Sequence, residues 1–327
     1  MKFFFHKIIK PAFFLLLFAL ILLYPKVSLS YAANGLKLWF DRMVPTLFPF
    51  MILSTVMIRQ NLTESFAGLL YPIAGRLYRM SRNCVYCLLL GFLCGFPMGA
   101  RTIAEMYERK NLTKREAEFL LAFCNNIGPV YYIGFFLPVT ELLNGKVSLG
   151  TFSIGRLPLF LFGMYGIPLV YGIFVRFTGF LLPKGQFLSE NTKQPEKQPE
   201  SFQKSLDYAM QGAIAGITTL GGYMILFNLL NILPYACFRL FSASVPETAP
   251  ALLHCMLEIT GGIMRLGGSA PFAALVLLPI GGLSCLAQTQ SMIQNTDLSM
   301  GRHILHKLVQ TGITAVYYLL LGGFLFR

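Results

Sequence analysis

The sequence predicts an all-α protein that crosses a membrane several times. Hydrophobic residues make up 55% of the 327 residues and charged residues only 13%, with a mean hydropathy of +0.61. An ordinary soluble domain carries about 25% charged residues. Several apolar runs are long enough to cross about 30 Å of hydrocarbon as helices. The net charge of +13 is spread along the chain, so it indicates membrane topology and contact with anionic lipid, with no sign of nucleic-acid binding.

A second observation is an internal repeat. The central segment recurs 186 residues downstream without a gap, so that Gly75 and Gly95 match Gly261 and Gly281, and Val130-Tyr-Tyr132 recurs at 316–318. A duplicated membrane chain points first to a transporter, because alternating access needs two related halves around a central site. We therefore divide the chain into a first repeat and a second repeat joined by a linker. Their predicted bounds are 1–182, 183–205 for the linker and 206–327.

Six full spans are expected, at about 3–24, 36–59, 130–144, 157–182, 208–233 and 304–326. The alternative for the first is a cleaved signal peptide, because Ser30-Tyr31-Ala32 resembles a cleavage site. The second begins with Trp39, Asp41 and Arg42, residues that suit a membrane interface. Pro45 and Pro49 are expected to bend this helix.

Two shorter apolar segments, 84–100 and 270–286, are predicted to be re-entrant hairpins. Each follows an amphipathic stretch, at 62–82 and 251–266, and each is rich in Gly and Pro. The first ends in Gly95-Phe-Pro-Met-Gly-Ala-Arg101 and the second in a polar run from Gly281 to Ser291. Open backbone at membrane depth must be buried in protein or face a water-filled cavity.

Polar helices are predicted at 101–123, split by a capping box that joins Thr113 and Glu116. Their acidic residues alternate with basic ones, which favours a solvated cytoplasmic helix pair over a proton relay. The acidic residues are Glu105, Glu108, Glu116 and Glu118. The run Cys124-Asn-Asn-Ile-Gly-Pro129 then breaks the helix before the next span.

The linker at 183–205 is rich in Gln, Pro, Ser, Lys and Glu and has almost nothing to bury. With the N-terminus and this linker in the cytoplasm, most of the 27 basic residues fall on the cytoplasmic side, as the positive-inside rule asks. Because the first span is the repeat partner of the one at 157–182, each half has three spans, counted as the first three and the last three. An odd number of spans in each half requires the halves to run in opposite senses. The predicted architecture is thus six spans and two re-entrant hairpins in two inverted-topology repeats.

No catalytic constellation stands out in the sequence. The chain has no GxxxxGK[ST], HExxH or GxSxG motif. Cys84-Val-Tyr-Cys87 is a lone CxxC, and the pair His303 and His306 has no acidic partner nearby. We therefore expect a protein that is not an enzyme and that holds no cofactor and no metal.

The polar residues at the breaks are the candidates for a binding site. The helix that restarts after Gly95 and Pro97 offers unpaired amides and a positive dipole end, which favour an anion. Arg101 adds a charged fork suited to a carboxylate, with a reach to the cytoplasmic interface as the alternative. The predicted substrate-binding residues are Gly95, Pro97, Gly99, Arg101, Thr102, Asn125, Asn126, Ser284, Gln288, Thr289 and Gln290. For the two asparagines, helix capping alone is the alternative.

These motifs resemble the YlbJ family of sporulation integral membrane proteins, which carry duplicated nucleoside-recognition (Gate) segments. The resemblance rests on Gly95–Arg101, Leu112–Glu118, Phe123–Pro129 and Gly281–Gln290, and it places Gate segments at about 36–145 and in the second repeat. It implies an architecture similar to concentrative nucleoside transporters and a place in the outer forespore membrane. It also implies transport of dipicolinic acid, a small planar dianion, from the mother cell.

Three functions follow as hypotheses. The first is a transporter of a small anionic carboxylate, dipicolinate by resemblance, that works by alternating access. The second is ion-coupled nucleoside uptake, for which Glu141 and Glu258 are the only nearby carboxylates. The third is a membrane assembly protein that contacts partners through 101–118 and the linker. Self-association and association with other sporulation membrane proteins both stay open.

Overall fold

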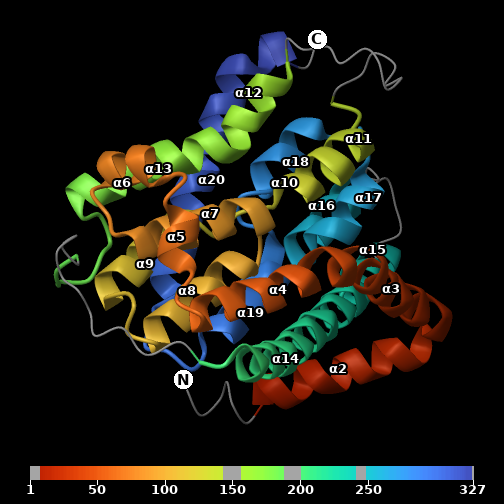
Figure 1. Cartoon of the computed structure of the whole chain (residues 1–327). Coiled ribbons are helices and arrows are strands. Elements are labelled where there is room, and N and C mark those ends of the chain that lie inside the picture. The colour runs from red at the N-terminus through yellow and green to blue at the C-terminus, as the bar shows by residue number, and fades with distance from the viewer. Residues whose placement is uncertain (1–7, 143–155, 188–199, 241–247, 326–327) are drawn as a thin grey trace.

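The computed structural model describes residues 8–142, 156–187, 200–240 and 248–325 (Figure 1). All regular structure in these ranges is helical, which confirms the all-α prediction. Five helical runs are long and apolar enough to cross a membrane, and they confirm a polytopic membrane protein where six spans were expected. These runs are Pro25–Arg59, Leu157–Thr178, Phe202–Arg239, Pro271–Ile293 and Met300–Gly323.

The first repeat contains α2 (Lys10–Leu23), α3 (Pro25–Leu38), η2 (Trp39–Met43), α4 (Val44–Arg59), α5 (Thr63–Ala67), α6 (Tyr71–Tyr78), α7 (Arg82–Cys94), α8 (Met98–Glu108), α9 (Lys114–Phe123), α10 (Pro129–Tyr131), η3 (Tyr132–Phe136), α11 (Leu137–Val139), α12 (Leu157–Leu161), η4 (Phe162–Gly166) and α13 (Ile167–Thr178). The second contains α14 (Phe202–Leu229), α15 (Ile232–Leu240), α16 (Thr248–Leu257), α17 (Ile259–Leu266), α18 (Pro271–Leu277), α19 (Gly282–Ile293) and α20 (Met300–Leu325). The η segments are π-helical turns inside longer helices. The central part of the predicted linker, 188–199, lies outside the described residues.

The helix predicted at 36–59 starts earlier than the sequence suggested. Pro25 opens α3, as proline often does at a first helical position, and α3, η2 and α4 form one helical run of 35 residues. Tyr31, in the candidate cleavage site, is buried within α3. Trp39 therefore lies in the middle of the run, where its Nε1 donates to the carbonyl of Ile217 at 2.8 Å. The prediction that Trp39 and Arg42 begin a helix at the interface is wrong, because no helix starts there.

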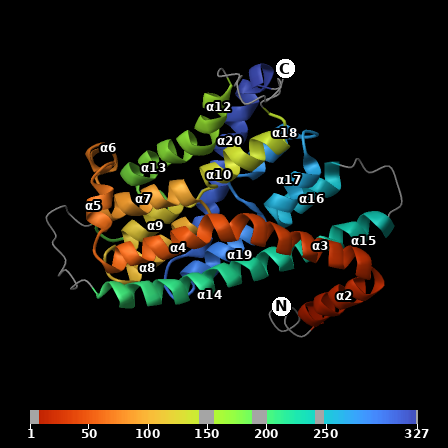
Figure 2. The same cartoon turned by 45° about the vertical axis from the view of Figure 1, so that its right-hand side comes forward.

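The long run α3–α4 packs along α14, as both views show (Figures 1 and 2). Small residues let the two backbones approach closely, as at other membrane helix interfaces. A Cβ on Gly35 would lie 2.7 Å from the carbonyl oxygen of Met224, and one on Gly221 would lie 2.5 Å from the Trp39 ring. This pair of helices forms one side of the site described below.

Helix breaks occur at the glycines that the repeat brings into register. Gly95 has φ +82° and ends α7, and Gly281 has φ +71° and precedes α19. Only glycine adopts such angles without strain. The Phe96–Pro97 peptide bond between α7 and α8 is cis. A further break, at 124–128, separates α9 from α10, as predicted. The corresponding part of the second repeat is helical throughout, because α20 continues without interruption.

The repeat-equivalent helices α8 and α19 lie side by side and run in the same direction. At their starts, a Cβ on Gly281 would lie 3.3 Å from the ring of Phe96. At their ends, the hydroxyl of Tyr107 donates to Oδ1 of Asp297 at 2.7 Å. Corresponding ends of the two helices are therefore neighbours.

The equivalent pair formed by α9–α11 and α20 is also parallel. His303 contacts Leu121 at one end, with 2.9 Å between Nδ1 and the carbonyl oxygen. At the other end, the hydroxyls of Tyr132 and Tyr318 donate to the same carbonyl of Phe160 at 3.1 and 3.4 Å. The repeat-related runs α3–α4 and α14, in contrast, are antiparallel, because Gly35 packs on Met224 near one end and Gln60 donates to Ser205 near the other. The segment predicted as a hairpin at 270–286 forms α18 and α19, which are separated by the break at Gly281 and together count among the candidate spans.

The charged helix pair α8 and α9 is only partly solvated. Thr113 and Glu116 form the predicted capping box. However, Glu116 and Glu118 are 0% and 2% exposed, because the body of α20 covers α9. Glu118 accepts from the amide of Ser299 at 2.8 Å and from Arg302 at 3.3 Å. The predicted solvated face is limited to the side of the helix pair that carries Glu108, which is exposed.

Candidate binding site

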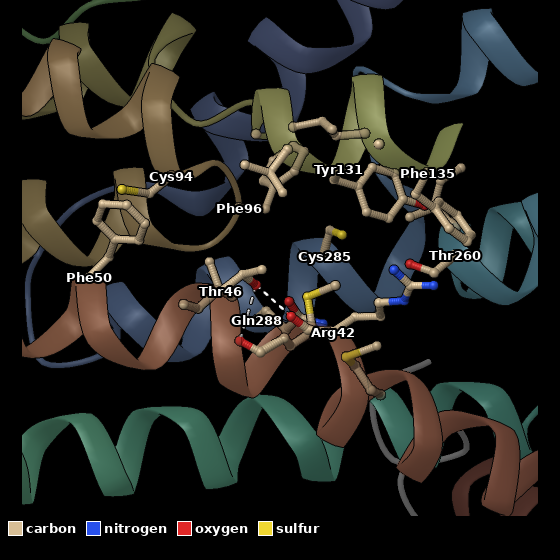
Figure 3. Close-up of a pocket in the computed structure, with 18 of the residues that line it drawn as sticks. Arg42, Thr46, Phe50, Cys94, Phe96, Tyr131, Phe135, Thr260, Cys285 and Gln288 are labelled. Atoms are coloured by element: carbon tan, nitrogen blue, oxygen red, sulfur yellow. Dashed lines mark hydrogen bonds between the residues drawn. The ribbon is translucent and has the colours of Figure 1, made fainter. Parts of the chain in front are cut away.

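A cavity of about 210 Å³ lies where the breaks of the two repeats meet (Figure 3). The first break supplies Phe96, and the second supplies Cys285 and Gln288 from α19. The long helix α3–α4 closes another side. The lining residues are Arg42, Met43, Thr46, Leu47, Phe50, Leu93, Cys94, Phe96, Ile127, Gly128, Val130, Tyr131, Gly134, Phe135, Met224, Glu258, Ile259, Thr260, Cys285 and Gln288. The cavity is thus mostly apolar, with a few polar groups.

Arg42 is the basic residue of this cavity. It lies in the π-helical turn η2, and π-turns inside α-helices are often found at functional sites. In Figure 3 its side chain extends along the cavity toward the side that carries Thr260. Thr46, one turn on, donates to the Arg42 carbonyl at 2.6 Å. Among the described residues, no carboxylate lies within 4.0 Å of the Arg42 guanidinium, so its charge is available to a ligand.

Glu258 is the acidic residue of the cavity, and its carboxylate is already engaged. It is 2% exposed and forms the N-cap of α17, accepting from the amides of Thr260 and Gly261 at 3.1 and 2.7 Å. Asn228 donates to it at 3.1 Å. Three hydrogen bonds at a helix N-terminus stabilise a carboxylate. Glu258 therefore does not serve as the counter-ion of Arg42.

A second cavity of about 450 Å³ adjoins the first, and Arg42 and Phe135 line both. Two further basic residues, Lys37 and Arg265, line this second cavity, together with a single aspartate, Asp41. Basic side chains therefore outnumber acidic ones along it. Such an arrangement raises the local concentration of anions.

Gln288 is the one predicted residue that lines the cavity. Its Nε2 donates to the hydroxyl of Ser284, one turn earlier on α19, at 3.0 Å. Both side chains are buried, at 5% and 0% exposed. Gln290, two residues on, is exposed and points away from this cluster.

Asn125 connects the two breaks. Its Oδ1 accepts from the amide of Ala100 at 3.3 Å, and its Nδ2 donates to Thr289 at 2.9 Å. The Asn125 side chain therefore occupies part of the start of α8, where the sequence predicted an anion-binding site. Gly99 permits this contact, because a Cβ there would lie 3.1 Å from the Cα of Asn125.

Arg101 is not brought to the cavity. Its guanidinium donates to the carbonyl of Gly212 at 3.0 Å and so ties α8 to α14. Thr102 is fully buried, and its hydroxyl has no hydrogen-bond partner among the described residues. Neither residue lines the cavity described above. Gly95 and Pro97 form the turn beside Phe96, which does line it.

A polar stripe on α20 was missed by the sequence reasoning. His303, Lys307 and Gln310 are each no more than 1% exposed, and all three contact the end of α9. His303 and Gln310 bond the carbonyls of Leu121 and Ala122, at 2.9 and 2.5 Å. The spacing i, i+4, i+7 on one face of an apolar helix was the available signal.

The five candidate spans found among the described residues define a polytopic α-helical membrane protein, and a small open cavity lies between its repeats. Over 97% of its length the chain is 25% identical, across 351 aligned positions, to the sporulation integral membrane protein YlbJ of Bacillus subtilis strain 168, and the alignment covers 83% of that protein. No family model and no solved structure matches the chain. The alignment supports placing the chain in the YlbJ-type family, as its motifs predicted.

Proposed function

We propose that this protein is a sporulation membrane transporter that carries a small carboxylate anion, with dipicolinic acid as the substrate. We infer a carrier and not an enzyme. In this proposal it moves the anion from the mother cell across the outer forespore membrane, with its N-terminus in the cytoplasm. The sporulation context rests on the similarity to YlbJ. The anionic substrate rests on Arg42, a cation that has no carboxylate partner in the described part of the chain and lines a cavity between two related halves.

The chemistry of the cavity suits a planar aromatic carboxylate. An arginine fork binds a carboxylate through two parallel hydrogen bonds, and Gln288 and Thr260 add neutral donors. Phe50, Phe96 and Phe135 offer apolar faces to a flat ring. A volume of about 210 Å³ is below the range of drug-sized pockets, so the ligand is small.

Alternating access would expose this cavity to one side of the membrane and then to the other. The cavity lies between elements of both repeats, so rocking of one repeat against the other changes which side is open. The second cavity, with Lys37, Arg42 and Arg265, is a basic approach to the first.

The test is uptake of labelled dipicolinate into proteoliposomes under imposed Na⁺ and H⁺ gradients. We expect saturable uptake by the wild type. Arg42→Gln should weaken apparent affinity about 10- to 100-fold, because a hydrogen bond to a charged group contributes about 1.5–3 kcal/mol. Arg76→Gln is the matched control, because Arg76 is exposed and should leave uptake unchanged.

Two results would contradict the proposal. One is no uptake by folded wild-type protein, which would favour the assembly-protein hypothesis. The other is dipicolinate uptake that Arg42→Gln leaves unaltered. Uptake of labelled nucleosides into the same proteoliposomes tests the remaining hypothesis, since a nucleoside carrier would take them up and excess dipicolinate would not compete.

A further inference from the structure

Lys307 is a fully buried lysine with no acidic partner among the described residues. It lies on α20 with 0% of its surface exposed, and its Nζ donates to Oδ1 of Asn126 at 2.8 Å. Among the described residues, no carboxylate lies within 4.0 Å of it. An ammonium has three donors, and this one makes a single hydrogen bond there. Burying a charge without a counter-ion is costly, above all inside a membrane.

The side chains that separate Lys307 from the cavity belong to the cavity wall. Nζ lies 5.1 Å from the centre of the Phe96 ring, and Phe96 lines the cavity. Ile127, the neighbour of Asn126, lines it too. One layer of side chains therefore stands between the ammonium and the ligand space.

A purely structural role for the charge is not sufficient. The end of α9 leaves carbonyls without helical partners, and a cation there interacts favourably with the helix dipole. Yet His303 and Gln310 already bond the carbonyls of Leu121 and Ala122. Nδ2 of Asn126 donates to the carbonyl of Phe123 at 2.6 Å. Among the described residues Lys307 donates only to the Asn126 side chain, and its ammonium also lies over the ring of Phe96.

We propose that Lys307 binds the second carboxylate of a dicarboxylate ligand, with Phe96 as the movable side chain between cavity and ammonium. This inference rests on the proposed function and names the residue that selects a dianion over a monoanion. Arg42 takes one carboxylate of the ligand and Lys307 the other. The ligand thereby supplies the counter-charge that the protein lacks.

The experiment compares binding of dipicolinate, which has two carboxylates, with binding of picolinate, which has one. Purified wild type should prefer dipicolinate about tenfold or more. Lys307→Gln should lower dipicolinate affinity by about that factor and leave picolinate within about threefold, because one charge-assisted hydrogen bond is removed. Arg42→Gln should weaken both ligands. Lys110→Gln, at an exposed lysine, should change neither.

Asn126→Asp provides a second variant that does not remove the lysine. It places a carboxylate at the position where Oδ1 already accepts from Nζ, so the ammonium gains an internal counter-ion. We expect it to lose the preference for dipicolinate while remaining folded. A purely structural lysine predicts an unchanged preference.

Failure of the proposed function and failure of the Lys307 assignment give different results. A folded wild type that binds neither anion overturns the proposed function. A wild type that prefers dipicolinate, together with Lys307→Gln or Asn126→Asp variants that keep this preference, overturns only the assignment of Lys307.

Discussion

Gly95 shows how a single residue places the site. Its φ of +82° turns the chain after α7, and a Cβ on it would lie 2.2 Å from the amide nitrogen of Gly128. The first break therefore packs directly on the second. Phe96 follows in sequence and enters the cavity wall. Both the left-handed backbone and the missing side chain are needed at this position.

We predict that Gly95→Ala destabilises the protein by more than about 2 kcal/mol, because it combines strain with overpacking. Gly222→Ala is the control, since a Cβ on Gly222 meets nothing within 4 Å and alanine favours a helix by about 0.5–1 kcal/mol. Thermal unfolding in detergent measures both. Equal midpoints for the two variants would show that the close packing at Gly95 is not required.

The helix α9 is stabilised by different means at its two ends. Its start is a capping box, in which Thr113 accepts from the amide of Glu116 at 3.2 Å and Glu116 accepts from the amide of Thr113 at 2.8 Å. Its end lies at the break, where side chains of α20 bond the free carbonyls. The first device is local in sequence, and the second joins residues more than 180 positions apart. The helix is therefore complete only when both repeats are folded.

Thr113→Ala should lower stability by about 0.5–2 kcal/mol, as expected for loss of an N-cap. Thr219→Ala is the matched control, because Thr219 is exposed within α14 and bonds only the carbonyl of Ala215. Its effect should stay within about 0.5 kcal/mol. Unfolding midpoints of the two variants in one detergent give the comparison. If Thr113→Ala lowers stability as little as Thr219→Ala does, the N-cap of α9 does not contribute measurably to stability.

The two halves of the molecule are joined at the loops that follow α8 and α19. Asp297 accepts from Lys114 at 2.7 Å and from the hydroxyl of Tyr107 at 2.7 Å. These hydrogen bonds, that from Lys114 first, hold the pKa of the Asp297 carboxyl below its ordinary value. The contact joins α8 and α9 to the loop after α19, so any rocking of one half against the other must accommodate it.

Asp297→Asn should lower stability at neutral pH by about 0.2–1 kcal/mol, the usual range for an exposed ion pair. Because the pKa is lowered on folding, the wild-type contribution is present at neutral pH and is lost as the pH falls below about 4. The difference in unfolding midpoint between wild type and variant should therefore shrink on acidification. A difference that is constant with pH would contradict this origin.

Much of the fold could be predicted because its signals are local. Composition indicated the membrane, Gly and Pro marked the breaks at Gly95 and Gly128, and a four-residue motif marked the start of α9. Interfaces could not be predicted in the same way. The sequence placed Arg42 at the start of a helix. In the structure the helix continues through a π-turn at this position, and Arg42 lines the cavity. Arg101 was expected to bind the anion, and it bonds α14 instead.

The sequence by itself determined an all-α membrane protein, its helix breaks and its duplicated pattern, because hydrophobicity and backbone preference act over a few neighbouring residues. Only the tertiary structure decided which polar groups share a cavity. Lys307 lies 181 residues from Asn126 along the chain, and a pattern within one helix does not specify the partner of a buried charge. Packing alone places Phe96 between that charge and the cavity.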